Sequence, residues 1–494
     1  MKFLFPIAII LPFLGSLFSI FLKDKKPNIE RFFIVGINVL FIVIILGLWR
    51  NLGHNVLNIF LLNKNISLSL VLDADNFREL IISCFLMTIL TFYSIKINLI
   101  ESHRHSNFLL YCGILFGLVN LAIFSANIFS LFFCFYLAQI TFLKLFISDI
   151  YKTIKVNLKD HKGYFTIFKN KNFKVTIFKI IFLSEVLLFF LATTLVINFS
   201  QDPQISQFGV DLSSSKIITI LIINIFILSI FLSILLPTYF LFKNDINDSA
   251  ITNILAFVVF FVFFKFLVFI KIIKSIISIG LFSAVFPKLI LNLIILILAI
   301  EMMISLGMIL FTKDIKKIGI QLFFNQLFFL AINILFMFFY DEENFPKILE
   351  SFVLSIILFF ITFSSLLVYL RGSSNKDIAG LFFDMRISIS LIIFSLINIC
   401  GLAPGYHMLI IFNLIKFYLS KKLYFILIIV LINILGIVLF TSKLTWVMIS
   451  KQENKRDQHD IDLAKKIDNS ISITFPSFLT ALVIIVAGFV TIFI

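Results

Sequence analysis

Apolar runs of about 20 residues follow one another along the whole chain, and almost every charged side chain lies in the gaps between them. Such a run is the length that a helix needs to cross the hydrocarbon core of a bilayer. In lipid the backbone must satisfy its own hydrogen bonds, and the runs are too long and too uniformly apolar for barrel strands. The pattern therefore predicts a helical membrane protein that crosses the bilayer many times.

About fourteen spans can be delimited by these runs. With 61% hydrophobic and 14% charged residues among 494, the chain leaves no room for a sizeable soluble domain. The predicted fold class is therefore an all-α polytopic membrane protein with about 14 transmembrane helices. The predicted spans are 3–22, 32–50, 77–97, 107–125, 127–149, 178–199, 216–242, 250–273, 288–312, 319–340, 347–370, 387–420, 422–447 and 472–494.

The twelfth span is too long for one straight helix across the bilayer. It contains Pro404 and Gly405, followed by His407, so we predict a discontinuous helix there. Pro237 lies five spans earlier, and five-helix units at that spacing have opposite orientations, which predicts two inverted repeats. The predicted parts are N-terminal helices 1–3 at 1–106, a first five-helix repeat at 107–273, a second at 288–447 and a last helix at 472–494.

The net charge of +15 is distributed unevenly between the two sides of the membrane. Loops on one side, including the Lys-rich loop 150–177, hold about 25 Lys and Arg against about 10 on the other. The basic side is expected to face the cytoplasm, with both termini outside. The positive charge is thus interpreted mainly as a topology signal, with contact to anionic lipid as the minor interpretation, rather than as a sign of nucleic-acid binding. The expected location is the inner membrane of a bacterium or of a mitochondrion.

Two stretches outside the spans carry a structural pattern. Residues 55–75 alternate in part between apolar and polar positions and end in Asp73 and Asp75, which predicts a short hairpin on the outer side. Residues 448–471 combine charges of both signs, which is typical of a helix with a solvated face.

The sequence contains no catalytic or cofactor motif. There is no phosphate-binding glycine loop, no metal-ligand cluster and no nucleophile with a partnered base. The cysteines lie in apolar spans without the spacing of a metal site, so we interpret them as buried apolar side chains. They are Cys84, Cys112, Cys134 and Cys400. We therefore expect no catalytic site, no metal and no cofactor in this chain.

A few ionisable side chains lie inside apolar spans: Lys144, Glu185, Lys265, Glu301 and Lys416. A charge at the bilayer centre costs about 2.5–3.5 kcal/mol on insertion scales, so these residues are the candidates for ion translocation. Lys144 and Lys416 lie near span ends, where a long side chain also reaches water. Lys265 and Glu301 are central, and we expect both to face the interior of the helix bundle.

Several short motifs occur in a consistent order along residues 60–420. They are Leu72-Asp73 before the third span, Pro237 before Lys265 with Val268-Phe269, Thr312-Lys313-Asp314-Ile315-Lys316-Lys317 before Asn325-Gln326, and Asp377-Ile378-Ala379-Gly380-Leu381 before Gly401-Leu402-Ala403-Pro404. In these motifs the sequence resembles the antiporter-like membrane subunits of respiratory complex I (NADH-quinone oxidoreductase) and of Mrp-type cation/proton antiporters.

The resemblance implies translocation of protons or monovalent cations, other membrane subunits as partners, and quinone reduction elsewhere in a complex. In the family's mechanism a Lys on a broken helix exchanges a proton as a neighbouring carboxylate approaches or leaves. The sequence departs from that pattern at three positions. Tyr136 replaces the fifth-span Glu, Leu232 and Ser233 the seventh-span Lys, and Ile411 the twelfth-span Lys or Glu. Lys265 alone matches the family's ionisable chain.

Three hypotheses remain open. The first is a membrane subunit of a proton- or cation-translocating complex, an NADH-quinone oxidoreductase or an Mrp-type antiporter, with degenerate pumping residues. The second is a non-pumping structural paralogue in such a complex. The third is an unrelated secondary transporter or flippase with about 14 helices, for which the order of the motifs would be a coincidence. As a complex I subunit, the chain would belong to an enzyme without containing its catalytic site.

Overall fold

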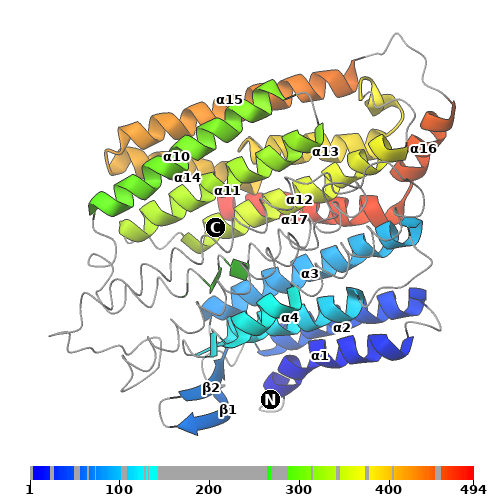
Figure 1. Cartoon of the computed structure of the whole chain (residues 1–494), viewed down its shortest axis with the longest axis vertical. Coiled ribbons are helices and arrows are strands. Elements are labelled where there is room, and N and C mark those ends of the chain that lie inside the picture. Colours follow the sequence, from blue (N-terminus) through cyan, green and yellow to red (C-terminus); the bar gives the residue numbers. More distant parts are fainter. Residues whose placement is uncertain are drawn as a thin grey trace, which may run out of the picture. The chain divides into compact units, whose positions relative to one another are not determined.

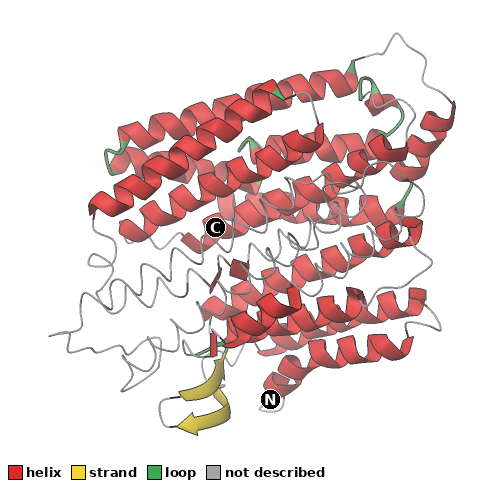
Figure 2. Cartoon of the chain, in the orientation of Figure 1, coloured by secondary structure: helices red, strands yellow, loops and turns green. Residues whose placement is uncertain are grey.

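The computed structural model is built mainly of long helices (Figures 1 and 2). It forms two compact units, Met1–Ala250 with Phe260–Pro287 and Ile251–Val259 with Lys288–Ile494. The residues that it describes are 4–22, 27–48, 56–63, 66–72, 74–101, 108–126, 130–131, 133–142, 264–265, 267–268, 271, 288–312, 315–340, 345–372, 378–402, 405–450 and 458–493. Lys144, Glu185, Pro237 and Pro404 lie outside these residues.

Four long helices belong to the described part of the first unit: α1 (Leu4–Leu22), α2 (Pro27–Leu48), α3 (Ala74–Glu101) and α4 (Phe108–Phe124). Helix α1 packs against α2 and α4, and α3 packs against the same two helices. A Cβ atom at Gly113 of α4 would lie 2.8 Å from Ser16 Cβ, and one at Gly117 would lie 2.7 Å from Phe13 Cζ. These glycines therefore let α4 approach α1 closely, as small residues do in membrane helix pairs.

The predicted hairpin is confirmed (Figure 2). Strand β1 (Val56–Asn63) pairs with β2 (Ile66–Val71) in antiparallel register, with Val56 opposite Val71. The backbone of Ser69 holds the hairpin to the following segments, because its N–H donates to Ser130 Oγ at 2.9 Å and its carbonyl accepts from the Ala126 N–H at 2.9 Å.

The described part of the second unit starts at α10 and continues to the end of α17. Helix α10 packs against α11 and α15, while α12 packs against α11, α13 and α17. The elements are α10 (Lys288–Phe311), α11 (Ile315–Phe339), α12 (Phe345–Gly372), the 3-10 helix η2 (Leu381–Phe383), α13 (Arg386–Ile399), α14 (Tyr406–Ser420), α15 (Tyr424–Ile449), α16 (Gln458–Asp468) and α17 (Ile471–Phe493).

The twelfth predicted span is interrupted, as the sequence indicated. Helix α13 ends in a Schellman turn, in which Leu402 N–H donates to Ile397 O at 3.2 Å and Gly401 N–H donates to Asn398 O at 3.0 Å. Gly401 has φ +69°, a left-handed conformation that favours glycine. A Cβ at Gly405, the residue before α14, would lie 1.9 Å from Asn398 Oδ1. Two glycines thus make the break possible.

Within the mixed-charge stretch, Gln458–Asp468 forms α16, as predicted, but only part of this helix is solvated. Asp462, Lys465 and Lys466 are exposed, whereas Asp468 is buried. The Asp468 carboxylate accepts hydrogen bonds from the backbone N–H groups of Ile387 at 3.1 Å and Ser388 at 2.7 Å. It therefore caps the first turn of α13, where the N–H groups have no intrahelical partner.

Two described helices are long and apolar enough to cross a membrane on length and composition: Ile294–Phe311, with mean hydropathy 2.7, and Tyr424–Ile449, with mean hydropathy 2.8. Further apolar helical stretches of 10–17 residues include Leu4–Phe18 and Arg386–Ile399. Large apolar side chains such as Ile300 and Leu435 are exposed on these helices. An all-α membrane protein is thus supported, while the count of 14 spans, the inverted repeats and the four-part division stay predictions.

Candidate functional site

The candidate residues inside the described ranges have different environments. Lys265 is buried, with 1% of its surface exposed, as expected. Glu301 is exposed on α10, so the expectation that it faces the bundle interior was wrong. Lys416 is exposed on α14, in keeping with a long side chain that reaches water. His407 is buried in the first turn of α14, 6.5 Å from the ring of Phe329 between centroids.

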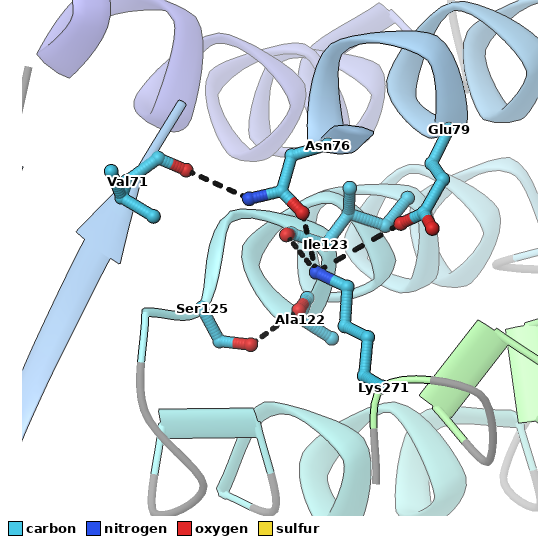
Figure 3. A network of polar contacts seen from close by, with 7 residues as sticks. All are labelled: Val71, Asn76, Glu79, Ala122, Ile123, Ser125 and Lys271. Carbon is cyan, nitrogen blue, oxygen red and sulfur yellow. Dashed lines mark hydrogen bonds and ion pairs between the residues drawn. The ribbon is translucent and has the colours of Figure 1, made fainter. Parts of the chain in front are cut away.

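A polar network around Lys271 is the most developed charged cluster in the described part of the first unit (Figure 3). Lys271 Nζ donates to Asn76 Oδ1 at 2.7 Å and to the carbonyl oxygen of Ile123. It lies 3.9 Å from Glu79 Oε2, and the two side chains are only 12% and 14% exposed. Asn76 Nδ2 in turn donates to Val71 O at 3.3 Å, which joins the network to the end of β2.

Local geometry explains why these groups meet. Asn76 and Glu79 are three residues apart at the start of α3, so they share one face of that helix. Ile123 is in the last turn of α4, where carbonyl groups have no intrahelical partner and the helix dipole is negative. The ammonium group of Lys271 therefore lies among an amide oxygen, a helix-end carbonyl and a carboxylate, all of which favour a positive charge.

A second polar layer lies one turn farther along both helices. Ser83, four residues after Glu79, donates through Oγ to Asn120 Oδ1 at 3.3 Å. Both residues are buried, and the Asn120 Nδ2 atom makes no hydrogen bond within the described chain. Gln139, in the helical segment 133–142, is 0% exposed, and neither its amide nitrogen nor its amide oxygen has a hydrogen-bond partner there.

Phe264, the residue before Lys265, packs against the helical segment 133–142 that contains Gln139. The ring of Phe264 is 5.5 Å from the ring of Phe135 between centroids. Phe135 precedes Tyr136, where the family resemblance leads us to expect a fifth-span Glu, and Gln139 follows one turn later. The buried lysine and the buried amide are therefore on neighbouring segments of the first unit.

The buried polar side chains of α10 to α15 in the second unit form neutral pairs. Asn325 Nδ2 donates to Asn433 Oδ1 at 2.7 Å and to Met302 O at 3.0 Å. Tyr418 donates to Asn333 Oδ1 at 2.5 Å, and Asn398 donates to Ser355 Oγ at 2.7 Å. Among the side chains of α10 to α15 that the structure describes, no Lys, Arg, Asp or Glu is buried. The buried ionisable group among them with a pKa near neutrality in water is the His407 imidazole.

Sequence reasoning missed Lys271 and Glu79. Both lie near the ends of predicted spans, 250–273 and 77–97, where a charged side chain is unremarkable. The signal that could have found them is the polar start of the third span, where Asn76 and Glu79 share a helical face. The four cysteines, by contrast, are buried as predicted.

No family model and no curated protein matches the sequence, but solved structures match the fold. A chain of the membrane-bound sulfane sulfur reductase (MBS), an archaeal respiratory membrane complex, matches with TM-score 0.70 and 12% identity over 98% of this chain and 75% of its own. A chain of the Mrp complex from Dietzia sp. DQ12-45-1b matches with TM-score 0.68 and 10% identity over 98% of this chain and 94% of its own. The chain has the antiporter-like subunit fold. The resemblance found in the motifs is thereby confirmed at the level of the fold.

Proposed function

We propose that this protein is a cation-translocating membrane subunit of a larger respiratory or antiporter complex, and that protons move through the interior of its first unit. The observation that carries the proposal is the largely buried network of Lys271, Glu79 and Asn76, in a chain whose fold matches subunits of such complexes. Buried ionisable groups are expensive in a membrane protein and mark ion pathways and proton relays.

The chemistry of the network favours protons over Na⁺ or K⁺. The Lys271 ammonium already occupies Asn76 Oδ1 and the Ile123 carbonyl, the oxygen atoms that a metal cation would need as ligands. Its charge also repels a second cation at short range. Ammonium and carboxylate groups exchange protons directly or through one water, so Glu79 and Lys271 can relay a proton where they cannot bind a metal ion.

Lys265 is the second ionisable group of the proposed path. Asn120 bonds to Ser83 one turn from Glu79, and Gln139 follows Phe135, whose ring packs against Phe264. Both amides have polar atoms that make no hydrogen bond within the described chain. Buried polar atoms of this kind are usually satisfied by internal water. We therefore infer that water beside these amides carries protons between the two lysines.

The test is proton uptake by the native complex in liposomes, with a K⁺ diffusion potential as the driving force and a pH-sensitive dye inside. Lys271→Ala and Glu79→Gln should each lower the rate at least tenfold, while Lys443→Ala, at an exposed lysine of α15, should leave it unchanged. Cation movement without a change of internal pH would overturn the assignment to protons, and a normal rate in both network variants would overturn the path.

A second candidate is the non-pumping structural paralogue. It is favoured by the neutral buried side chains described for α10 to α15 of the second unit. It is also favoured by Ile411, which is buried beside Gly401 where the family's ionisable residue is expected. Under this alternative the chain still assembles into the complex. An imposed potential then changes the internal pH at the same rate in the wild type and in Lys265→Ala.

A further inference from the structure

Glu301 lies at mid-length of a strongly apolar helix and on its outer face. It is the eighth residue of the 18-residue apolar stretch Ile294–Phe311. The residues exposed beside it are large and apolar, among them Ile300 at 51% and Ile304 at 56%. The opposite face of α10, with Met302 and Ile309, is buried where α10 packs against α11 and α15. The carboxylate thus belongs to the outward-facing stripe.

Hydrocarbon is an unsuitable neighbour for this side chain. A charged group at the bilayer centre is rare unless it faces protein, water or a partner charge. Among the residues that the structure describes, no hydrogen bond or ion pair to Glu301 is formed. The group that stabilises it must therefore come from outside the described chain and must reach the middle of the membrane.

Gly307 provides a second, independent indication of helix docking. It borders the same stripe, and a Cβ atom built on it would meet nothing within 4 Å. Gly113, Gly117 and Gly319, in contrast, are needed for packing inside the chain, because a Cβ at each would come within 3 Å of a neighbouring side chain. A small residue without an internal packing role lets another membrane helix approach closely.

We propose that the outer face of α10, formed by Ile297, Ile300, Glu301, Ile304 and Gly307, is the docking surface for a transmembrane helix of a different membrane subunit that carries Lys or Arg at the depth of Glu301. Charge complementarity selects this occupant, because lipid tails offer neither a cation nor a donor. A two-fold pairing with a second copy would bring the same carboxylate to both sides of one interface and supply no cation. The proposal concerns assembly and holds whether or not the chain translocates ions.

Photo-crosslinking in native membranes identifies the occupant. Benzoylphenylalanine replaces Ile300 or Ile304 in turn, and Leu435, exposed on α15, serves as the control position. The expected product joins the α10 positions to a membrane span that contains Lys or Arg within its apolar stretch, with at least tenfold less product at the control position. A product with a second copy of the chain, with a span that lacks a basic residue, or with no protein would overturn the proposal.

Matched variants then test the contact itself by native electrophoresis of gently solubilised membranes. Glu301→Lys and Gly307→Leu should each reduce the share of the chain in the high-mass assembly at least tenfold. Gly36→Leu is the control for adding a leucine side chain to an open helix surface, because Gly36 of α2 has the same open space around its Cβ position. The cross-linked span of the partner contains the basic residue that should face Glu301. Replacing that residue by Glu should restore assembly of the Glu301→Lys variant, because the two charges are then exchanged.

Equal assembly of wild type and both α10 variants would overturn the surface, as would failure of the charge exchange to restore it. Protease-cleavage patterns in membranes separate misfolding from failed docking, because the unassembled variants should keep the wild-type pattern. A complex that depends on Glu301 for assembly but moves no protons would support this surface while overturning the proposed function.

Discussion

The two units bury different chemistry inside the same kind of helical scaffold. In the first unit Lys271, Glu79 and Lys265 place ionisable groups among apolar helices. In α10 to α15 of the second unit, buried polar side chains form neutral hydrogen bonds instead, such as those of Asn325 with Asn433 and of Tyr418 with Asn333. Amide and hydroxyl pairs fix helix positions but do not change charge near neutral pH. We propose from this difference that proton transfer takes place in the first unit, whereas α10 to α15 of the second unit serve the architecture.

The largest expected effect on stability lies in the first unit. Lys271→Ala leaves the Glu79 carboxylate buried without the ammonium group, which costs about 3 kcal/mol. Asn325→Ala in the second unit removes hydrogen bonds between neutral groups and should cost about 1–3 kcal/mol. Thermal unfolding in detergent, followed by circular dichroism, should give the lower midpoint for Lys271→Ala. The opposite order would show that buried charge is not what distinguishes the first unit.

The helix break in the second unit should give the next largest effect. Gly401→Ala places an L-residue at φ +69°, which costs about 1–2 kcal/mol, and its Cβ would lie 2.1 Å from Ile411 Cδ1. Gly307→Ala is the matched control, because its Cβ meets nothing and helix propensity favours Ala by up to about 1 kcal/mol. Unfolding midpoints should therefore move in opposite directions, and a neutral Gly401→Ala would contradict the role given to that residue.

The smallest effect is expected at the cap of α13. Asp468→Ala removes the acceptors of the Ile387 and Ser388 N–H groups, and loss of an N-cap costs about 1 kcal/mol. Asp462→Ala, at an exposed position of α16, the helix that carries Asp468, should change stability by less than about 0.5 kcal/mol. Equal midpoints for the two variants would mean that the buried Asp468 carboxylate does not stabilise the protein by capping α13.

The helices were predictable because the bilayer sets their length. The predicted spans 288–312 and 422–447 correspond to α10 (Lys288–Phe311) and α15 (Tyr424–Ile449). The break after Ile399 was also predictable, because Gly401 and Gly405 mark a backbone that a helix does not continue through. Propensity and apolar length act locally, so the sequence contains this information directly.

The orientation of side chains around a helix was not predictable in the same way. Hydropathy indicates the depth of Glu301 but not its direction, which is set by the packing of Met302 and Ile309 against neighbouring helices. Lys271 and Glu79 were missed because their contact joins residues 192 positions apart, and only tertiary packing brings them to 3.9 Å. Lys265 was placed correctly, since a mid-span lysine with no nearby span end has no route to water.

The most direct test of the difference between the units compares Lys265→Ala with His407→Gln in the reconstituted native complex. Each variant replaces a buried ionisable side chain, one in the first unit and one in the second. With assembly verified by native electrophoresis, proton uptake should fall to the background rate for Lys265→Ala and stay within about twofold of wild type for His407→Gln. Normal uptake in Lys265→Ala, or its loss in His407→Gln, would contradict the assignment of proton transfer to the first unit.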